Sequence, residues 1–160
     1  MLSIPWYVVI FESIPEAFLV LVMGFALFRI RIDTKHAMII AVLSAFSTYL
    51  IRLAPIVFGV HSLIAAAVMI ILTVVIARID VGSATLAILG GIVILAILQS
   101  LMAPTLFNLA SVQFSDVSDR PWLNILFFIP QAVVMIIIYI TVLRNDWYLY
   151  DLSQKGKNRA

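Results

Sequence analysis

The chain has 160 residues, of which 64% are hydrophobic and only 11% charged, and its formal net charge is +2. Soluble domains carry about 45–50% apolar and about 25% charged residues, and small domains bury the smallest share of their surface. This composition therefore excludes a soluble globular protein and indicates that lipid is the solvent. The absence of cysteine also excludes disulfides, thiolate metal sites and thiol nucleophiles.

Five apolar segments are each long enough to cross the hydrocarbon layer, which takes about 20 helical residues. Continuous apolar runs of this length predict helices rather than barrel strands, which would alternate. The expected fold is all-α, a polytopic transmembrane bundle over residues 1–146 with a short tail at 147–160. The predicted helices, in chain order, are residues 5–28, 37–58, 62–79, 84–107 and 122–143.

The connections between these helices are short. The amino terminus has no basic region and no clear cleavage site, so the first helix is expected to be retained rather than removed as a signal peptide. Gly59 and His61 predict a tight turn, and residues 108–120 form the only long loop expected.

The basic residues predict the orientation of the bundle, because Lys and Arg gather in cytoplasmic loops. Only Arg120 stands on one side, and Arg52 lies within a helix. The other side holds eight, which places the amino terminus outside and the carboxy terminus in the cytoplasm. These eight are Arg29, Arg31, Lys35, Arg78, Arg144, Lys155, Lys157 and Arg159.

Small residues recur every four positions in the fourth helix, at Ser83, Ala87 and Gly91. Such a ridge lets the backbone of a neighbouring helix approach closely. Packing within the chain and dimerisation both remain open, and the former is favoured.

Polar side chains interrupt the apolar segments in the outer half of the bundle. A charge at the centre of a bilayer costs about 2.5–3.5 kcal/mol, so such groups usually face protein or water. Pro15, Pro55, Pro104 and Pro130 lie in the same layer and free backbone carbonyls, which favours an outer cavity with broken helix walls. The predicted polar cluster comprises Glu12, Glu16, Arg52, Gln99 and Gln131, with Asn124 nearby.

Three interpretations of this cluster stay open. In the first, Glu12 and Arg52 form a structural salt bridge, and a protonated Glu16 bonds to Gln131. In the second, the cluster lines a cavity for a ligand or ion. In the third, it is exposed to a wide vestibule. The matching tetrapeptides IPEA (14–17) and IPQA (129–132) suggest a parallel repeat in which Glu16 and Gln131 are near-equivalent.

No motif indicates an enzyme or a cofactor. The only histidines, His36 and His61, lie on opposite predicted sides and form no metal-ligand pattern with carboxylates. No glycine-rich phosphate loop or catalytic triad is visible. We therefore expect no catalytic residues, no metal, no cofactor and no nucleic acid partner.

Three stretches resemble the amino-terminal membrane domain of bacterial sensor histidine kinases of the peptide-sensing, agr-like kind: SIPEAF (13–18), IRLAPIVFGVH (51–61) and ILFFIPQ (125–131). The resemblance implies a multi-pass protein of the bacterial plasma membrane that recognises an extracellular signal, with Glu16, Arg52 and Gln131 as pocket residues. The seventeen residues after Leu143 hold no phospho-acceptor helix or ATP-binding domain, so we expect either a stand-alone relative or an excised membrane domain, and kinase activity is not implied.

The sequence thus favours a sensory or ligand-binding module whose polar pocket opens to the extracellular side and signals to the cytoplasmic tail. Two alternatives are a small transporter or its substrate-binding membrane subunit, and an oligomeric channel or membrane assembly protein. The expected partners are the lipid bilayer, an extracellular small molecule or peptide, a cytoplasmic or membrane protein, and further copies of the chain.

Overall fold

The structure is a computed structural model that describes residues 5–53, 60–111 and 120–152. Its described residues form helices and connecting segments, without a strand. Five helical spans are long and apolar enough to cross a membrane, which confirms the five predicted helices. The elements are α1 (Trp6–Val8), the π-helical turn η1 (Val9–Ser13), α2 (Ile14–Leu27), α3 (Thr34–Leu53), α4 (Val60–Ala77), α5 (Val81–Ala110) and α7 (Trp122–Arg144).

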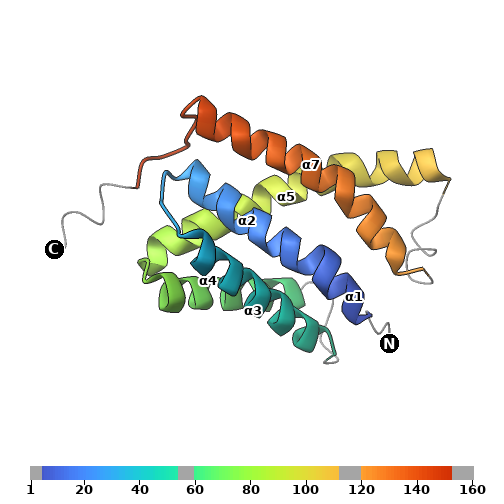
Figure 1. The fold of residues 1–160 in the computed structure, drawn as a ribbon, viewed down its shortest axis with the longest axis horizontal. Helices are drawn as coiled ribbons and strands as arrows, with labels where there is room; N and C mark the ends of the chain where they lie inside the picture. Colours follow the sequence, from blue (N-terminus) through green and yellow to red (C-terminus); the bar gives the residue numbers. More distant parts are fainter. Residues whose placement is uncertain (1–4, 54–59, 112–119, 153–160) are drawn as a thin grey trace.

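The first span is one continuous rod made of α1, η1 and α2, and it lies at the centre of the bundle (Figure 1). Helices α3, α5 and α7 pack around it, and α4 packs against α3 and α5. The largest fully buried apolar side chains come from α2, α3, α5 and α7, so the core surrounds this central rod. They are Leu21, Met23, Phe25, Ile40, Ile88 and Met135.

The outer faces of the helices carry large apolar side chains. Leu63 on α4 is 73% exposed, Val75 is 68% exposed and Leu101 on α5 is 67% exposed. Soluble proteins rarely expose such continuous apolar surface, whereas lipid-facing helices require it. The architecture therefore indicates a multi-pass membrane helix bundle.

Helices α2 and α5 meet backbone to backbone. A Cβ atom on Gly24 would overlap the carbonyl group of Ala87, and one on Gly91 would overlap the carbonyl oxygen of Val20. Ser83, Ala87 and Gly91 are all buried. The small-residue ridge predicted from the sequence thus packs within the chain, against α2.

Proline shapes the spans less than expected. The π-helical turn Val9–Ser13 directly precedes Pro15, and the Ile14 N–H bonds to the carbonyl of Val9. Wider π-helical bonding near a proline keeps the helix continuous despite the lost donor. Helix α5 continues through Pro104, and α7 continues through Pro130. The prediction of broken helix walls is therefore wrong at these two positions. Pro55 lies outside the described residues.

Some predicted boundaries differ from the observed ones. Helix α5 continues to Ala110, so Asn108 is helical and not part of a loop. The same helix starts at Val81 because Asp80 caps it: its side chain accepts hydrogen bonds from the backbone N–H of Ser83 (2.9 Å) and the Ser83 hydroxyl (2.7 Å). The tight turn at Gly59 and most of the predicted long loop lie outside the described residues.

The segment after α7 folds back onto the end of α2. The backbone N–H of Leu149 donates to the carbonyl of Leu27 (2.8 Å), and that of Leu152 donates to the carbonyl of Phe28 (3.1 Å). Arg29 forms an ion pair with Asp151 at 3.2 Å. The first residues of the predicted tail are therefore attached to the bundle. We call this contact the tail clasp (residues 27–29 with 148–152).

Candidate functional site

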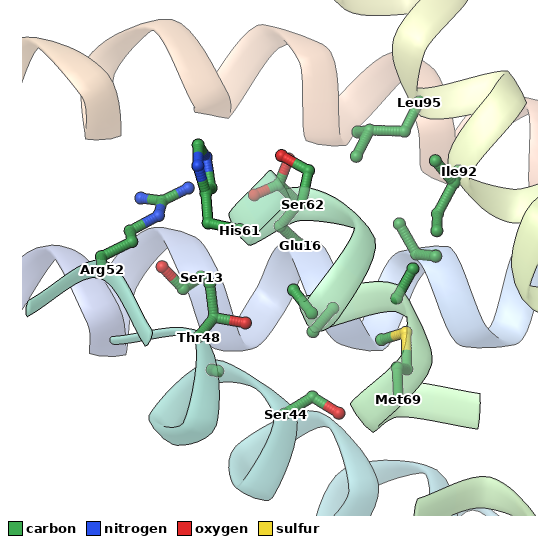
Figure 2. A pocket seen from close by; sticks show the side chains of 15 residues that line it. Ser13, Glu16, Ser44, Thr48, Arg52, His61, Ser62, Met69, Ile92 and Leu95 are labelled. Carbon is green, nitrogen blue, oxygen red and sulfur yellow. The ribbon is translucent and has the colours of Figure 1, made fainter. Parts of the chain in front are cut away.

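A cavity of about 250 Å³ lies between α2, α3, α4 and α5 (Figure 2). Its lining combines polar and apolar side chains from all four helices. The polar ones are Ser13, Glu16, Ser44, Thr48, Arg52, His61 and Ser62, and the apolar ones are Ala17, Val20, Ala45, Ala65, Ala66, Met69, Ile92 and Leu95.

Helical spacing explains why these side chains share one cavity. Ser44, Thr48 and Arg52 follow one another at intervals of four residues on α3, which places them on one face. At 1.5 Å per residue, the eight residues from Ser44 to Arg52 span about 12 Å. The cavity therefore has a charged end near Arg52 and a deeper end near Ser44.

Glu16 lies at the charged end and is held by Gln99. The Gln99 Nε2 donates to the Glu16 Oε1 over 3.0 Å. This bond joins α2 to α5, on the same pair of helices whose backbones meet at Gly24. It fixes one carboxylate oxygen of Glu16 and leaves the other for a further donor.

Arg52 projects from α3 into the same end of the cavity. Among the described residues, its side chain forms no ion pair or hydrogen bond with Glu12 or Glu16, although its charge acts on both carboxylates. In the view of Figure 2 the His61 side chain lies between those of Arg52 and Glu16. The Glu12–Arg52 salt bridge of the first interpretation is therefore not formed in the described structure.

Ser44 marks the deeper end of the cavity and is unusual for a buried serine. It is 4% exposed, and its Oγ has no hydrogen-bond partner. Serine and threonine in helices commonly donate to the carbonyl four residues earlier, as Thr73, Ser100, Thr105 and Thr141 do here. Figure 2 shows the Ser44 hydroxyl turned toward the side of Met69.

The remaining members of the predicted cluster do not line this cavity. Gln131 is 8% exposed on α7, and its Nε2 is buried without a partner. Glu12 lies in η1 and has one such atom, Oε2. Glu16 is bonded to Gln99 and not to Gln131, so the pairing in the first interpretation is wrong. The matching tetrapeptides predicted near-equivalent positions for Glu16 and Gln131, but Glu16 lines the cavity and Gln131 does not.

Several lining residues carried no signal in the sequence. Ser44, Thr48 and Ser62 are neutral residues that membrane helices tolerate at many positions. His61, expected only as part of a tight turn, lies in the first turn of α4 and lines the cavity. The four-residue spacing of Ser44, Thr48 and Arg52 could have indicated that the two neutral residues share a helix face with the recognised Arg52.

The lining suits a small molecule with both charged and apolar parts. No group of three or more His, Asp or Glu side chains within the described residues is placed to hold a metal ion. A second cavity, of about 310 Å³, lies between α5 and α7. It is lined by Leu106, Leu109, Ala110, Leu126, Phe127, Ile129 and Pro130, which offer no polar side chain.

Comparisons with known proteins give no relative for this chain: no family model, no curated protein and no solved structure matches it.

Proposed function

We propose that this chain is a ligand-binding, sensory membrane module whose cavity between α2, α3, α4 and α5 receives a small molecule from the extracellular side. The observation that carries the proposal is the cavity itself, with Glu16 and Arg52 at one end and the partnerless hydroxyl of Ser44 at the other. Polar side chains that served only to hold helices together would be expected to bond with one another, because unpaired buried groups are costly.

The size of the cavity favours a small ligand. Pockets for drug-sized molecules span about 300–1,000 Å³, and this one is about 250 Å³. A peptide signal could place no more than about one side chain inside it. A single small molecule is therefore the better candidate for the occupant.

The charge distribution supports an orientation with the carboxy terminus in the cytoplasm. The connections at residues 28–33 and 78–80 lie at the same end of the bundle as the end of α7 (Figure 1). Arg29, Arg31, Arg78 and Arg144 gather at this end, as expected for the cytoplasmic side. The charged end of the cavity would then face outside. Fusion of a reporter to the carboxy terminus tests this; activity of an outside-only reporter would contradict it.

The path of a signal is supported by the position of α2. Glu16 and Val20 line the cavity on this helix, and its last residue, Leu27, accepts a hydrogen bond in the tail clasp. A rigid helix moves as a unit, so a shift of α2 on ligand binding would reach the clasp directly. We propose that the clasp is the output of the module.

Transport is less well supported than binding. A transported ligand must leave toward the opposite side of the membrane, so its path would continue past Ser44. Beyond this residue the described core is filled mainly by fully buried apolar side chains, including Met23, Ile40 and Ile88. The buried Thr73 hydroxyl donates to a carbonyl of its own helix, that of Met69. A channel would likewise need polar side chains along this path.

Native mass spectrometry of the protein released from mild detergent tests the proposal. The wild-type chain should carry a discrete bound mass, or acquire one from an extract of small molecules. Ala66 lines the cavity, so Ala66→Phe should fill it and remove the adduct. Ala67, the next residue on α4, is exposed, and Ala67→Phe is the matched control that should keep the adduct.

Two results would contradict the proposal. The wild-type protein could carry no adduct under any of these conditions. Alternatively, the same adduct could remain in the Ala66→Phe variant, which would place the bound molecule elsewhere on the bundle.

A further inference from the structure

The charged end of the cavity holds the acid Glu16 and the base Arg52, with the His61 side chain between them in the view of Figure 2. Glu16 comes from α2 and Arg52 from α3, and no ion pair links them within the described structure. Glu16 is half-buried, whereas Arg52 is exposed, so the guanidinium can attract an anionic group that enters the cavity, and an unpaired Glu16 carboxylate is costly where it is removed from water. One carboxylate oxygen of Glu16 is bonded to Gln99, which leaves the other, with the whole guanidinium of Arg52, for a ligand.

The wall next to these charges is apolar. Met69 on α4 and Ile92 and Leu95 on α5 turn their side chains toward the cavity (Figure 2). Alanines at positions 45, 65 and 66 keep it open. A ligand that fills this space therefore needs an apolar body beside its charged group.

We infer that the ligand is a small zwitterion with an apolar side chain, of the chemical class of the apolar α-amino acids. Its ammonium group would bond to Glu16, its carboxylate to Arg52, and its side chain would pack against Met69, Ile92 and Leu95. A ligand with a single charge would leave either Glu16 or Arg52 without a partner. This inference rests on the proposed function, because it names the occupant of the same cavity.

The test compares three forms of one molecule on the full chain in lipid nanodiscs. The probes are free leucine, the corresponding amine without the carboxylate, and the corresponding carboxylic acid without the amino group. Free methionine and phenylalanine cover other side-chain shapes. At least one amino acid should bind, by calorimetric titration, about tenfold or more tightly than the two leucine analogues, because each analogue leaves a pocket charge unpaired.

Two variants assign the ends of the ligand. Arg52→Gln should weaken amino acid binding to the level of the amine and leave binding of the amine unchanged. Glu16→Gln should weaken amino acid binding to the level of the carboxylic acid and leave binding of that acid unchanged. For each variant, binding of the amino acid is compared with binding of the amine and of the carboxylic acid. A variant that fails to fold would bind none of the three, and so would be recognised.

The outcomes separate this inference from the function on which it rests. An amine or an acid that binds as tightly as the amino acids would overturn the zwitterion. So would an adduct with the mass of a phospholipid, whose zwitterionic headgroup is the other source of the same chemistry. If no probe binds but an adduct is lost in Ala66→Phe, the inference fails and the ligand-binding function stands. If no probe binds and no adduct exists, both fail.

Discussion

Three buried polar atoms in the described structure have no hydrogen-bond partner: Glu12 Oε2, Ser44 Oγ and Gln131 Nε2. Each such atom costs roughly 1–3 kcal/mol if it is left dry. Only that of Ser44 belongs to a side chain lining the cavity between α2, α3, α4 and α5. A ligand or a water molecule could therefore satisfy Ser44 without any change in helix packing.

The hydroxyl of Ser44 should add nothing to the stability of the empty protein. We expect Ser44→Ala to leave the free energy of unfolding unchanged or to raise it by up to about 1 kcal/mol, because it removes an unpaired polar group. Thr73→Val is the control, since the Thr73 hydroxyl donates to the Met69 carbonyl over 2.8 Å; it should lower stability by about 0.5–1 kcal/mol. Thermal unfolding in detergent measures both. A similar loss in both variants would mean that Ser44 has a partner within the protein.

The two glutamines of the predicted cluster should respond in opposite ways. Gln99→Met removes the hydrogen bond to Glu16, and we expect it to lower the free energy of unfolding by about 0.5–1 kcal/mol. Gln131→Met removes a buried amide whose Nε2 has no partner, so it should be neutral or stabilising. The same thermal unfolding experiment compares them. The prediction is wrong if Gln131→Met is the more damaging change.

Single residues show where the sequence was informative. Glu16, Arg52 and Gln99 could be recognised because charge and amide groups are expensive inside a membrane. Their partners could not be predicted, since a pairing such as Glu16 with Gln99 depends on how two helices rotate about their axes. The position of Ser44 in the cavity could not be predicted for the same reason. A serine in a membrane helix can face lipid, the protein core or a cavity at similar cost, so its surroundings depend on how the helices pack.

At the scale of elements, the contact between α2 and α5 limits what can be substituted. Gly24→Ala and Gly91→Ala each force a methyl group into a backbone carbonyl of the other helix. We expect each to cost about 1–3 kcal/mol or more, as overpacking does in cores, and to broaden the thermal unfolding transition. Carbonyl atoms cannot rotate away as a side chain can, so the helices themselves would have to separate.

Gly82→Ala provides the control for these substitutions. Its added methyl group would meet only the Asp80 side chain, at 3.3 Å. Alanine is also the better helix former, so stability should change by less than about 0.5 kcal/mol. Equal losses at Gly82 and Gly24 would indicate a general intolerance of the helix and not a close contact.

The same pair of helices shows what a periodic pattern can predict. The spacing of Ser83, Ala87 and Gly91 predicted a close helix contact and favoured one within the chain, and both are observed. The pattern did not name α2 as the partner, because the small residues of that helix, Ala17, Gly24 and Ala26, do not recur every four positions. Helix identity was predictable from length and hydropathy, whereas neighbours are set by tertiary packing of surfaces that are apolar on all sides.

At the scale of the whole molecule, the tail clasp should depend on Arg29. This residue pairs with Asp151 and lies 5.0 Å from the ring centroid of Tyr148. We expect Arg29→Gln to speed hydrogen exchange at the Leu149 and Leu152 amides by about two- to fivefold, the effect of losing one exposed ion pair.

Arg31→Gln is the matched control for the clasp, because Arg31 is an exposed residue of the same connection and does not contribute to it. It should leave exchange at both amides unchanged. Slower or equal exchange in Arg29→Gln would show that the two backbone hydrogen bonds hold the clasp without the ion pair. The wild-type protein with a bound ligand can be measured in the same way, and a change at these amides would support the proposed output.

The contact between α2 and α5 has a mechanical consequence for the cavity. Because the backbones of α2 and α5 touch at Gly24 and Gly91, we expect these two helices to move as one rigid pair, which forms one side of the cavity. Helices α3 and α4 pack together and form the other side. Residues 28–33 and 78–80 connect the two sides. The volume of the cavity would then change by movement of the α2–α5 pair relative to α3 and α4. Because the chain has no cysteine, one pair of cysteines introduced between the two sides of the cavity would supply its only thiols. Cross-linking this pair would hold the cavity at one width.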